Sequence, residues 1–364
     1  MNTPLSSPSI LSLATGVPAA RHSQQEIFGE FVDLLGRKLG KLDPRRVRAM
    51  QVIFDRAGVG FRHSIVQQGY FANERSTQTR NDLYMAEAVP LGESIIRCGL
   101  AQAGYTPDDI DDLIVVSCTG FNIPGLDLLL AERFGMRPDL RRTCVLGMGC
   151  YGAFPGLLRA TEAVLSRAGR RVLVLAIELC SLHLQLEDTA ENVVSSALFS
   201  DGAAMVLIGD DTAGEGRTVN GPRLVCSATH CDYKTLKHMS FNVTDHGFQM
   251  YLSSYVPDLL AAQIDPFVDN LLAQQHLTRR EVRFWGIHPG STKIVDYVQA
   301  KLGLSHEQVT CSHEVLYQYG NMSSATILFV LDHIQRCSQP SPGDYGVLLA
   351  FGPGLTMEGL LVRW

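Results

Sequence analysis

Short apolar runs rich in β-branched residues alternate along this chain with segments of helical periodicity. Eight runs are expected to form strands, at residues 9–15, 112–118, 143–148, 171–178, 203–209, 223–229, 282–288 and 345–352. Helical patterns lie at 82–103, 151–168, 256–274, 291–302 and 321–336. This alternation predicts an α/β fold, and a chain of 364 residues has room for one large domain or two fused halves.

A short internal repeat favours two halves. The segment TPDDI at 106–110 precedes one predicted strand, and TRREV at 278–282 precedes another, 172 residues later. An offset of 171 residues places Cys150 over Asn321, and each of them follows a glycine and opens a helical pattern. We interpret the two residues as the same structural position in two copies of one unit, whose helix starts would meet in one site.

The repeat also predicts where the chain divides. We expect an N-terminal half, residues 1–220, that carries Cys150, and a C-terminal half, residues 221–364, that carries His288 and Asn321. Residues far apart in the sequence would then share one site.

Composition excludes several classes of protein. A net charge of -6 with interspersed signs gives no basic field for nucleic acid. The nine cysteines are odd in number and include no CxxC pair, so neither a disulfide framework nor a zinc site is indicated. No apolar stretch reaches the roughly 18 residues of a membrane span, and no basic residue precedes the first apolar run as in a signal peptide. We therefore expect a cytoplasmic protein with reduced thiols.

Cys150 lies where a predicted strand gives way to a predicted helix, in the segment GMGCYGAF. A cysteine in the first turn of a helix meets unpaired N–H groups and the positive end of the helix dipole, which favour the thiolate. Gly147 and Gly149 would let another backbone or a substrate approach closely. A buried structural cysteine is the alternative, and the local sequence does not separate it from a nucleophile.

Two further side chains suggest partners for such a thiol. His288 ends a predicted strand that Pro289 and Gly290 stop, as expected of a residue delivered to a cleft. Asn321 lies at a helix start, where a simple N-cap is the alternative role. A thiolate, an imidazole and an amide together can accept an acyl group as a thioester and stabilise a carbonyl oxygen as it becomes an enolate.

Five ordered motifs make this chemistry specific. They are GMGCYGAFPGLLRA at 147–160, ALFSDGAAMVLIG at 197–209, WGIHPG at 285–290, YGNMSSATILFV at 319–330 and FGPGLTMEG at 351–359, with VVSCTGFNIPGLD at 115–127 as a further pocket-lining stretch. In these motifs the chain resembles the type III polyketide synthases, the chalcone and stilbene synthase family, from about residue 8 to the C-terminus.

The resemblance implies a fold, a chemistry and roles for the three residues. It implies an α/β thiolase fold with duplicated αβαβα layers, a homodimer, and coenzyme A thioesters as substrates without a metal or redox cofactor. Cys150 would take the starter acyl group. His288 and Asn321 would bind malonyl-CoA, promote its decarboxylation and hold the enolate, and His288 would keep Cys150 ionised.

The same carry-over names the surroundings of the site. Phe199 would stand at the junction of tunnel and cavity, and the other expected substrate-binding residues are Cys118, Thr119, Ile123, Cys180, His183, Met250, Gly352, Pro353 and Gly354. Arg56 and Arg62 fall in the segment of the basic entrance that binds coenzyme A, although FDRAGVGFRH matches that segment poorly. Ser200 and Ala350 depart from the family pattern, because glycine is usual at both positions.

Two pocket residues suggest the starter. Met250 stands where many relatives have a rigid phenylalanine, and an unbranched side chain can move aside for an alkyl chain. Cys180 puts a small apolar group on the wall, as in bacterial members that make alkylpyrones or alkylresorcinols. We therefore expect a medium- or long-chain fatty acyl starter, extension with malonyl-CoA, and a pyrone or resorcinol product.

Two alternatives remain at this stage. A 3-oxoacyl-carrier-protein synthase III shares the Cys, His and Asn logic but condenses once, and the loop FGPGLTMEG argues against it. A non-catalytic acyl-binding partner subunit would be expected to lose its nucleophile, whereas Cys150 is present.

Overall fold

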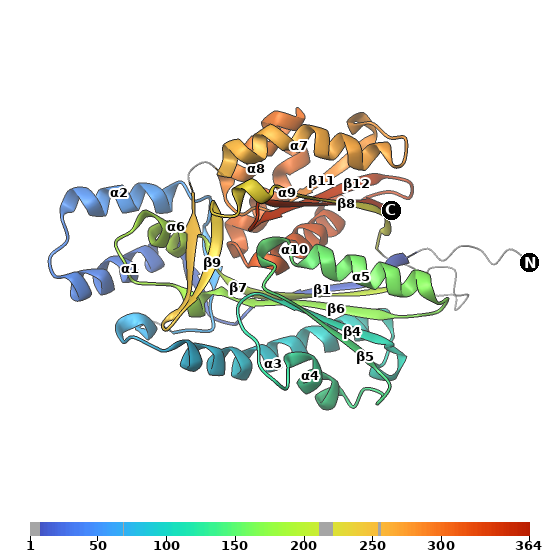
Figure 1. Cartoon of the computed structure of the whole chain (residues 1–364), viewed down its shortest axis with the longest axis horizontal. Coiled ribbons are helices and arrows are strands. Elements are labelled where there is room, and N and C mark those ends of the chain that lie inside the picture. Colours follow the sequence, from blue (N-terminus) through green and yellow to red (C-terminus); the bar gives the residue numbers. More distant parts are fainter. Residues whose placement is uncertain (1–7, 68, 211–220, 254–255) are drawn as a thin grey trace, which may run out of the picture.

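The chain forms layers of helices and sheets, and the computed structural model describes residues 8–67, 69–210, 221–253 and 256–364. Figure 1 shows helices α3 and α4, a first sheet, the central helices α5 and α10, a second sheet, and helices α7 and α8, in that order. Three large apolar cores fill the space between these layers. The predicted five-layer αβαβα arrangement is confirmed.

The first sheet is built from five strands. They are β1 (Pro8–Gly16), β4 (Asp112–Ser117), β5 (Arg141–Leu146), β6 (Val172–Leu179) and β7 (Asp201–Asp210), in the spatial order β5-β4-β6-β7-β1. Strand β4 runs parallel to β5 and β6, and β7 runs antiparallel to β6 and β1. Every residue of β6 and β7 is buried, as expected for strands covered on both faces.

The second sheet repeats this plan with one strand fewer. Its strands are β8 (Arg223–Cys231), β11 (Val282–Ile287), β12 (Tyr345–Gly352) and β13 (Thr356–Arg363), in the order β11-β12-β13-β8. The pairing of Ser9 on β1 with Arg223 on β8 joins the two into one continuous nine-stranded sheet. Strand β11 is parallel to β12, and β13 is antiparallel to both neighbours, which matches β4, β6, β7 and β1. Helix α9 (His306–Tyr319) occupies the place in the chain that β5 has in the first half.

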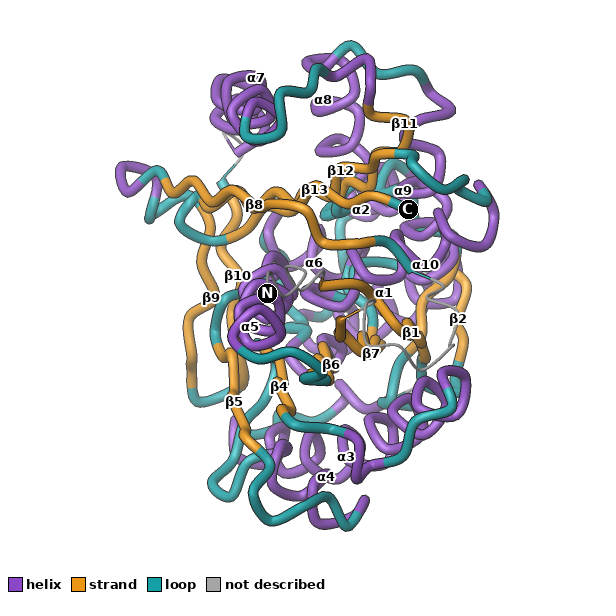
Figure 2. The backbone as a smooth tube through the Cα atoms, turned by 90° about the vertical axis from the view of Figure 1, so that its right-hand side faces the viewer, coloured by secondary structure: helices purple, strands orange, loops and turns teal. Residues whose placement is uncertain are grey.

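Ten α-helices lie in the described part of the chain. Besides α9 they are α1 (Gln24–Leu39), α2 (Pro44–Asp55), α3 (Thr77–Ala103), α4 (Leu126–Phe134), α5 (Ala153–Ser166), α6 (Ala190–Leu198), α7 (Val256–Ala273), α8 (Thr292–Leu302) and α10 (Thr326–His333). Two short strand pairs complete the fold, β2 (Arg21–Ser23) with β3 (Phe61–His63), and β9 (Met239–Thr244) with β10 (Gly247–Leu252). Figure 2 shows β9 and β10 as a pair that stands apart from the main sheets.

The internal repeat is visible in backbone geometry. Thr106 and Thr278 precede two short 3-10 turns with nearly identical backbone angles, φ -112° and ψ 165° against φ -114° and ψ 164°. In both turns an acidic side chain three residues later accepts the threonine N–H, at 2.7 Å from Asp109 and 2.7 Å from Glu281. Each turn then leads into the equivalent strand, β4 or β11. The predicted division between residues 220 and 221 stays a prediction, because residues 211–220 lie outside the described part.

All eight predicted strands are present with some shifted boundaries, and five further strands, β2, β3, β9, β10 and β13, were not predicted. The sequence did not predict β13, in which Glu358 and Gly359 interrupt the apolar pattern. Helix α3 begins at Thr77 rather than near 82, because the Ser76 side chain accepts the Thr79 N–H and caps it. The pattern at 321–336 begins with a 3-10 turn and ends in a π-helix, so only α10 is α-helical.

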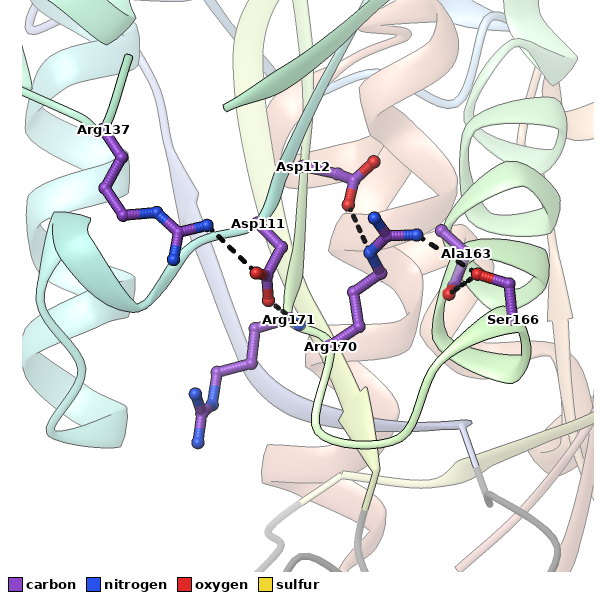
Figure 3. A network of polar contacts seen from close by, with 7 residues as sticks. All are labelled: Asp111, Asp112, Arg137, Ala163, Ser166, Arg170 and Arg171. Atoms are coloured by element: carbon purple, nitrogen blue, oxygen red, sulfur yellow. Dashed lines mark hydrogen bonds and ion pairs between the residues drawn. The ribbon is translucent and has the colours of Figure 1, made fainter. Parts of the chain in front are cut away.

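Ion pairs fix the strands of the first half at the end away from the predicted site (Figure 3). The carboxylate of Asp111 accepts the Arg171 N–H at 2.9 Å and pairs with Arg137 at 3.0 Å. The neighbouring Asp112 pairs with the buried Arg170 at 3.0 Å, and Arg170 donates to the Ser166 hydroxyl at the end of α5. These contacts hold β4, β6 and α5 together at one end. The opposite ends of the three elements, which lead to the predicted site, are thereby fixed relative to one another.

Candidate active site

Cys150 lies in a tight turn between β5 and α5. Gly147 and Gly149 have φ of 71° and 74°, the left-handed region that favours glycine, and a 3-10 turn at Gly149–Tyr151 leads into α5. A Cβ on Gly149 would come within 2.9 Å of the Pro353 ring. A Cβ on Gly352 would lie 2.6 Å from the Tyr151 ring and 3.6 Å from the Cys150 nitrogen. The C-terminal loop therefore packs on the turn that holds the thiol.

Asn321 opens the equivalent turn of the second half. It follows Gly320, whose φ of 71° nearly equals that of Gly149. The Asn321 backbone bridges the segment around Phe199, since its N–H donates to Leu198 and its carbonyl accepts from Ser200, each at 2.9 Å. The predicted equivalence of the two turns is therefore present in the backbone.

Ser323 joins the two turns, and sequence reasoning missed it. Its hydroxyl lies 3.6 Å from the Cys150 sulfur and 3.2 Å from the Cys118 sulfur, and its N–H donates to the Asn321 Oδ1 at 2.9 Å. Its φ of 47° is unusual for a residue with a side chain, and such strain is often found at functional sites. The sequence feature that could have indicated this role is the serine pair Ser323 and Ser324, which lies two and three residues after Asn321.

His288 lies at the end of β11 and is fully enclosed. Its backbone N–H donates to the Leu349 carbonyl at 2.7 Å, and its side chain is 1% exposed. Neither ring nitrogen has a hydrogen-bond partner among the described residues. Gly290 connects this ring to the amide, because its carbonyl accepts the Asn321 Nδ2 at 3.3 Å and its Cβ position is 3.7 Å from the ring. A buried imidazole without partners is suited to a ligand.

The protonation states differ from the expectation of a preformed thiolate. Burial raises the pKa of the Cys150 thiol to about 11, and hydrogen bonds from Ser323 and Asn321 offset only part of this. Burial lowers the pKa of the His288 imidazole to about 3. Both shifts favour a neutral thiol and a neutral imidazole in the free chain and act against the expected thiolate–imidazolium pair, which stays a prediction.

A buried carboxyl beneath the thiols was also missed. Glu178, at the end of β6, accepts hydrogen bonds from the Thr119 hydroxyl at 2.7 Å, the Cys118 N–H at 3.0 Å and the Ser324 hydroxyl. Burial raises the pKa of Glu178, and these donors lower it. Glu178 therefore ties β4, β6 and the start of α10 together under the site.

A pocket opens beside these groups, and we call it the cavity. It is lined by six predicted residues, Cys118, Thr119, Cys180, His183, Phe199 and Met250, and by seven that were not predicted, Leu184, Gln185, Asn192, Ser195, Phe241, Phe248 and Ser323. Phe199, Cys180 and Met250 pack together in one small apolar cluster. Most of the unpredicted residues come from the β9–β10 hairpin and α6, whose positions depend on tertiary packing.

His183 is a structural part of this wall. Its Nε2 lies 2.7 Å from the Thr119 carbonyl, its Nδ1 accepts the Phe248 N–H at 3.2 Å, and its ring stacks on Phe248 at 4.1 Å. Burial lowers the pKa of His183 to about 4. The ring is therefore neutral and fixes the hairpin against the cavity.

Other predicted residues lie outside the cavity lining. Ile123 is 92% exposed, and Arg56 is exposed at the end of α2. Gly352 and Pro353 pack on the nucleophile turn as described above, and Gly354 has a φ of 122°. These positions support the turn or the surface and do not line the cavity.

Arg62 is not placed to bind a phosphate group. It is 2% exposed and donates to the Phe199 carbonyl at 3.2 Å. Its Cγ fills the space beside Gly320, and the charge of Asp201 raises its pKa against the lowering effect of burial, which brings it to about 9. The expected contact of Arg62 with coenzyme A is therefore wrong, because the side chain supports the backbone bridge between Phe199 and Asn321.

The contacts of the Ser200 side chain account for a serine at a position where the family usually has glycine. Its hydroxyl donates to the His63 carbonyl at 3.1 Å and accepts the His63 N–H at 2.9 Å. Strand β3 is thereby attached to the segment that carries Phe199.

The described residues contain neither a metal site nor a membrane-spanning helix. No group of three or more His, Cys, Asp or Glu side chains there could hold a metal ion. Within the same residues, no helix is both long and apolar enough to cross a membrane.

Comparison with known proteins assigns the family. The N-terminal domain of chalcone and stilbene synthases matches residues 67–212, and the C-terminal domain matches residues 223–364. The chain belongs to this family and is a type III polyketide synthase with a thiolase fold.

Its relatives cover nearly the whole chain. A 1,3,6,8-tetrahydroxynaphthalene synthase of Streptomyces peucetius is 32% identical over 98% of this chain and 93% of its own. The alpha-pyrone synthesis polyketide synthase-like Pks18 of Mycobacterium tuberculosis is 30% identical over 97% and 90%. Among solved structures, PKS-I of the brown alga Ectocarpus siliculosus superposes with a TM-score of 0.91 at 28% identity over 100% of both chains.

The raised pKa of Cys150 predicts slow alkylation at neutral pH. The rate with iodoacetamide, followed by peptide mass spectrometry, should rise about tenfold per pH unit from roughly pH 7 to pH 10. Ser323→Ala removes a donor that lowers the pKa, so it should slow the reaction further at each pH. A rate that levels off below about pH 8.5 would show that the thiolate is already formed.

The position of Arg62 predicts a defect in turnover and not in binding. Arg62→Lys keeps the charge near Asp201 but loses the planar donor, so kcat should fall about tenfold while KM for malonyl-CoA changes less than about twofold. Arg56→Gln is the matched variant at the other residue expected to bind coenzyme A, which is exposed at the end of α2. A raised KM with unchanged kcat in Arg62→Lys would contradict the supporting role.

Proposed function

We propose that this enzyme loads an acyl-CoA starter on Cys150 and extends it by decarboxylative condensation with malonyl-CoA, then cyclises the chain. The main support is the Ser323 contact, which places the Cys150 thiol beside the Asn321 amide at the edge of the cavity. The chemistry uses coenzyme A thioesters and requires neither a metal nor a redox cofactor.

Loading begins with a proton transfer. The neutral imidazole of His288 takes the proton of the Cys150 thiol as the sulfur attacks the thioester carbonyl of the starter. A new carbon–sulfur bond forms, and coenzyme A leaves as a thiolate that recovers the proton. The buried His288 ring has no hydrogen-bond partner among the described residues, which supports this role, because a ring nitrogen can accept the proton without breaking a contact seen there.

Extension depends on the orientation of the Asn321 amide. The Ser323 N–H binds Oδ1, so the amide NH₂ group is directed to the side of Gly290 and His288. One N–H reaches the Gly290 carbonyl at 3.3 Å, and the amide also donates to the Cys150 sulfur in the free chain, a contact that a substrate oxygen would replace. The amide and the imidazole would hold the malonyl thioester carbonyl, so that loss of carbon dioxide gives an enolate that attacks the acyl group on Cys150.

The cavity wall supports a medium- or long-chain fatty acyl starter and a pyrone or resorcinol product. Cys180 and Met250 pack against Phe199, and the Met250 sulfur accepts the Ser195 hydroxyl at 3.7 Å. A thiol and a thioether leave more room than the aromatic side chains that could stand there, and both present apolar surface to an alkyl chain.

We also propose a homodimer in the cytoplasm. Strand β5 is an edge strand of its sheet with mostly exposed residues, and such an edge offers unpaired backbone groups to another chain. Leu146 on β5, and Phe121 and Ile123 in the segment after β4, are exposed apolar side chains. All nine cysteines are free, as expected for a reducing compartment.

Cys150→Ala should separate the two half-reactions. The variant should lose polyketide formation and the covalent acyl adduct, while malonyl-CoA decarboxylation persists because His288 and Asn321 remain. Mass spectrometry of the intact chain and of products from a panel of acyl-CoA starters measures both. Polyketide made by the variant would contradict the role of Cys150, one condensation per starter would favour the synthase III alternative, and no acyl adduct on the wild type would favour a non-catalytic subunit.

The starter proposal predicts a dependence on chain length. Each buried methylene contributes about 0.8 kcal/mol, so four further carbons should favour binding by roughly 3 kcal/mol, or over a hundredfold. Cys180→Phe and Met250→Trp should shift the optimum toward shorter starters, whereas Cys98→Phe, on the surface of α3, should not. Flat efficiency across chain lengths together with unchanged profiles in both cavity variants would show that the starter is of another class.

A further inference from the structure

A second group of thiol, imidazole and carboxylate lies on the surface, away from the condensing site. The Cys337 sulfur lies 3.9 Å from the His333 Nδ1, and the His333 Nε2 lies 2.6 Å from a Glu314 carboxylate oxygen. Cys337 is exposed, and the two partner side chains are partly exposed. Neither the polyketide chemistry nor the cavity uses these residues.

The end of α10 explains how the three side chains meet. Helix α10 ends at His333 and continues as the π-helix Ile334–Ser338, so Cys337 follows His333 by about one turn on the same face. Ile334 is buried and anchors that turn. Glu314 comes from α9, which packs against α10.

The geometry determines which ring nitrogen of His333 carries the proton. The Glu314 carboxylate can only accept, so the proton of the neutral imidazole lies on Nε2 and the lone pair of Nδ1 faces the thiol. A base beside a nucleophile, oriented by a third group, is the arrangement that activates cysteine and serine in covalent catalysis.

The other exposed thiols lack this arrangement. Cys98 accepts the Gln102 amide at 3.2 Å, and burial together with Asp127 raises the pKa of Cys144 to about 11. Of the three cysteines classed as exposed, Cys337 is the one with an imidazole at its sulfur.

We propose that Cys337 is a site of reversible S-thiolation by low-molecular-weight disulfides. His333 Nδ1 takes the thiol proton, and the sulfur of Cys337 attacks one sulfur of the disulfide. A new disulfide joins Cys337 to that half, while the other half leaves as a thiolate and takes the proton from His333. Cys337 is oxidised, and the leaving half is reduced. This exchange needs only a nucleophile and access, whereas acyl transfer also needs donors for an oxyanion.

The site is separate from the condensing residues. Asn321 precedes the start of α10, whereas Cys337 lies beyond its end, and the intervening helical residues span roughly 15–20 Å. Modification of Cys337 therefore does not require access to the cavity, and the proposal does not depend on the proposed polyketide chemistry.

The test measures the rate of exchange at each cysteine of the full chain. The protein is incubated with oxidised glutathione, and each thiol is quantified by peptide mass spectrometry. Cys337 should react at least about tenfold faster than Cys98, because a positioned base accelerates proton removal. His333→Gln should bring the Cys337 rate to within about threefold of Cys98, and Glu314→Ala should lower it by a smaller factor.

Cys98 and a second histidine provide the controls. Cys98 gives the rate of an exposed thiol without an imidazole beside it in each variant. His306→Gln, on the same helix as Glu314, should leave the Cys337 rate unchanged. Equal rates at Cys337 and Cys98 in the wild type, or a Cys337 rate that His333→Gln does not lower, would overturn the proposal.

Discussion

The contact between the Ser323 hydroxyl and the Cys150 sulfur, at 3.6 Å, joins the two halves of this protein at the site. It exists because α5 and α10 lie in one central layer between the two sheets, with their first turns at the same place. Each turn follows a glycine with positive φ, and each is held by a loop of the other half or a neighbouring strand. A shift of either sheet would separate the thiol from the amide, so the layered core is also what positions the chemistry.

Of the elements in the described part of the chain, the sequence predicted eight of thirteen strands and five of ten α-helices. It also predicted the pairing of the two turns, because such features depend on local periodicity and on a repeat that spans half the chain. It did not predict Ser323 or Glu178 as site residues, since their roles are buried contacts between distant segments. Arg62 was assigned to the wrong environment, because the identity of a charged residue does not reveal that it is 2% exposed. The hairpin residues Phe241 and Phe248 were missed for the same reason, since tertiary packing alone brings them to the cavity.

The ionisation of Cys150 shows which of two opposing effects is larger. A helix start stabilises a negative charge by about 0.3–1 kcal/mol, and up to about 2 in favourable geometry. A thiol pKa near 11 corresponds to roughly 2–3 kcal/mol against the thiolate, and burial is its main cause. Desolvation therefore exceeds the helix dipole and the two side-chain donors together. The charge of the nearby buried Glu178 also raises the pKa of Cys150.

A neutral thiol beside a neutral imidazole links nucleophile activation to substrate binding in the proposed mechanism. Separating their charges in a buried site is unfavourable until a thioester carbonyl is present to accept the sulfur's electrons. The proton then moves to the His288 ring, whose nitrogens have no hydrogen-bond partner among the described residues. The sulfur uses its electron pair to form the new carbon–sulfur bond. The burial that raises the pKa of Cys150 and lowers that of His288 therefore opposes proton transfer before an acyl group has entered, and it keeps the resting thiol unreactive toward other electrophiles.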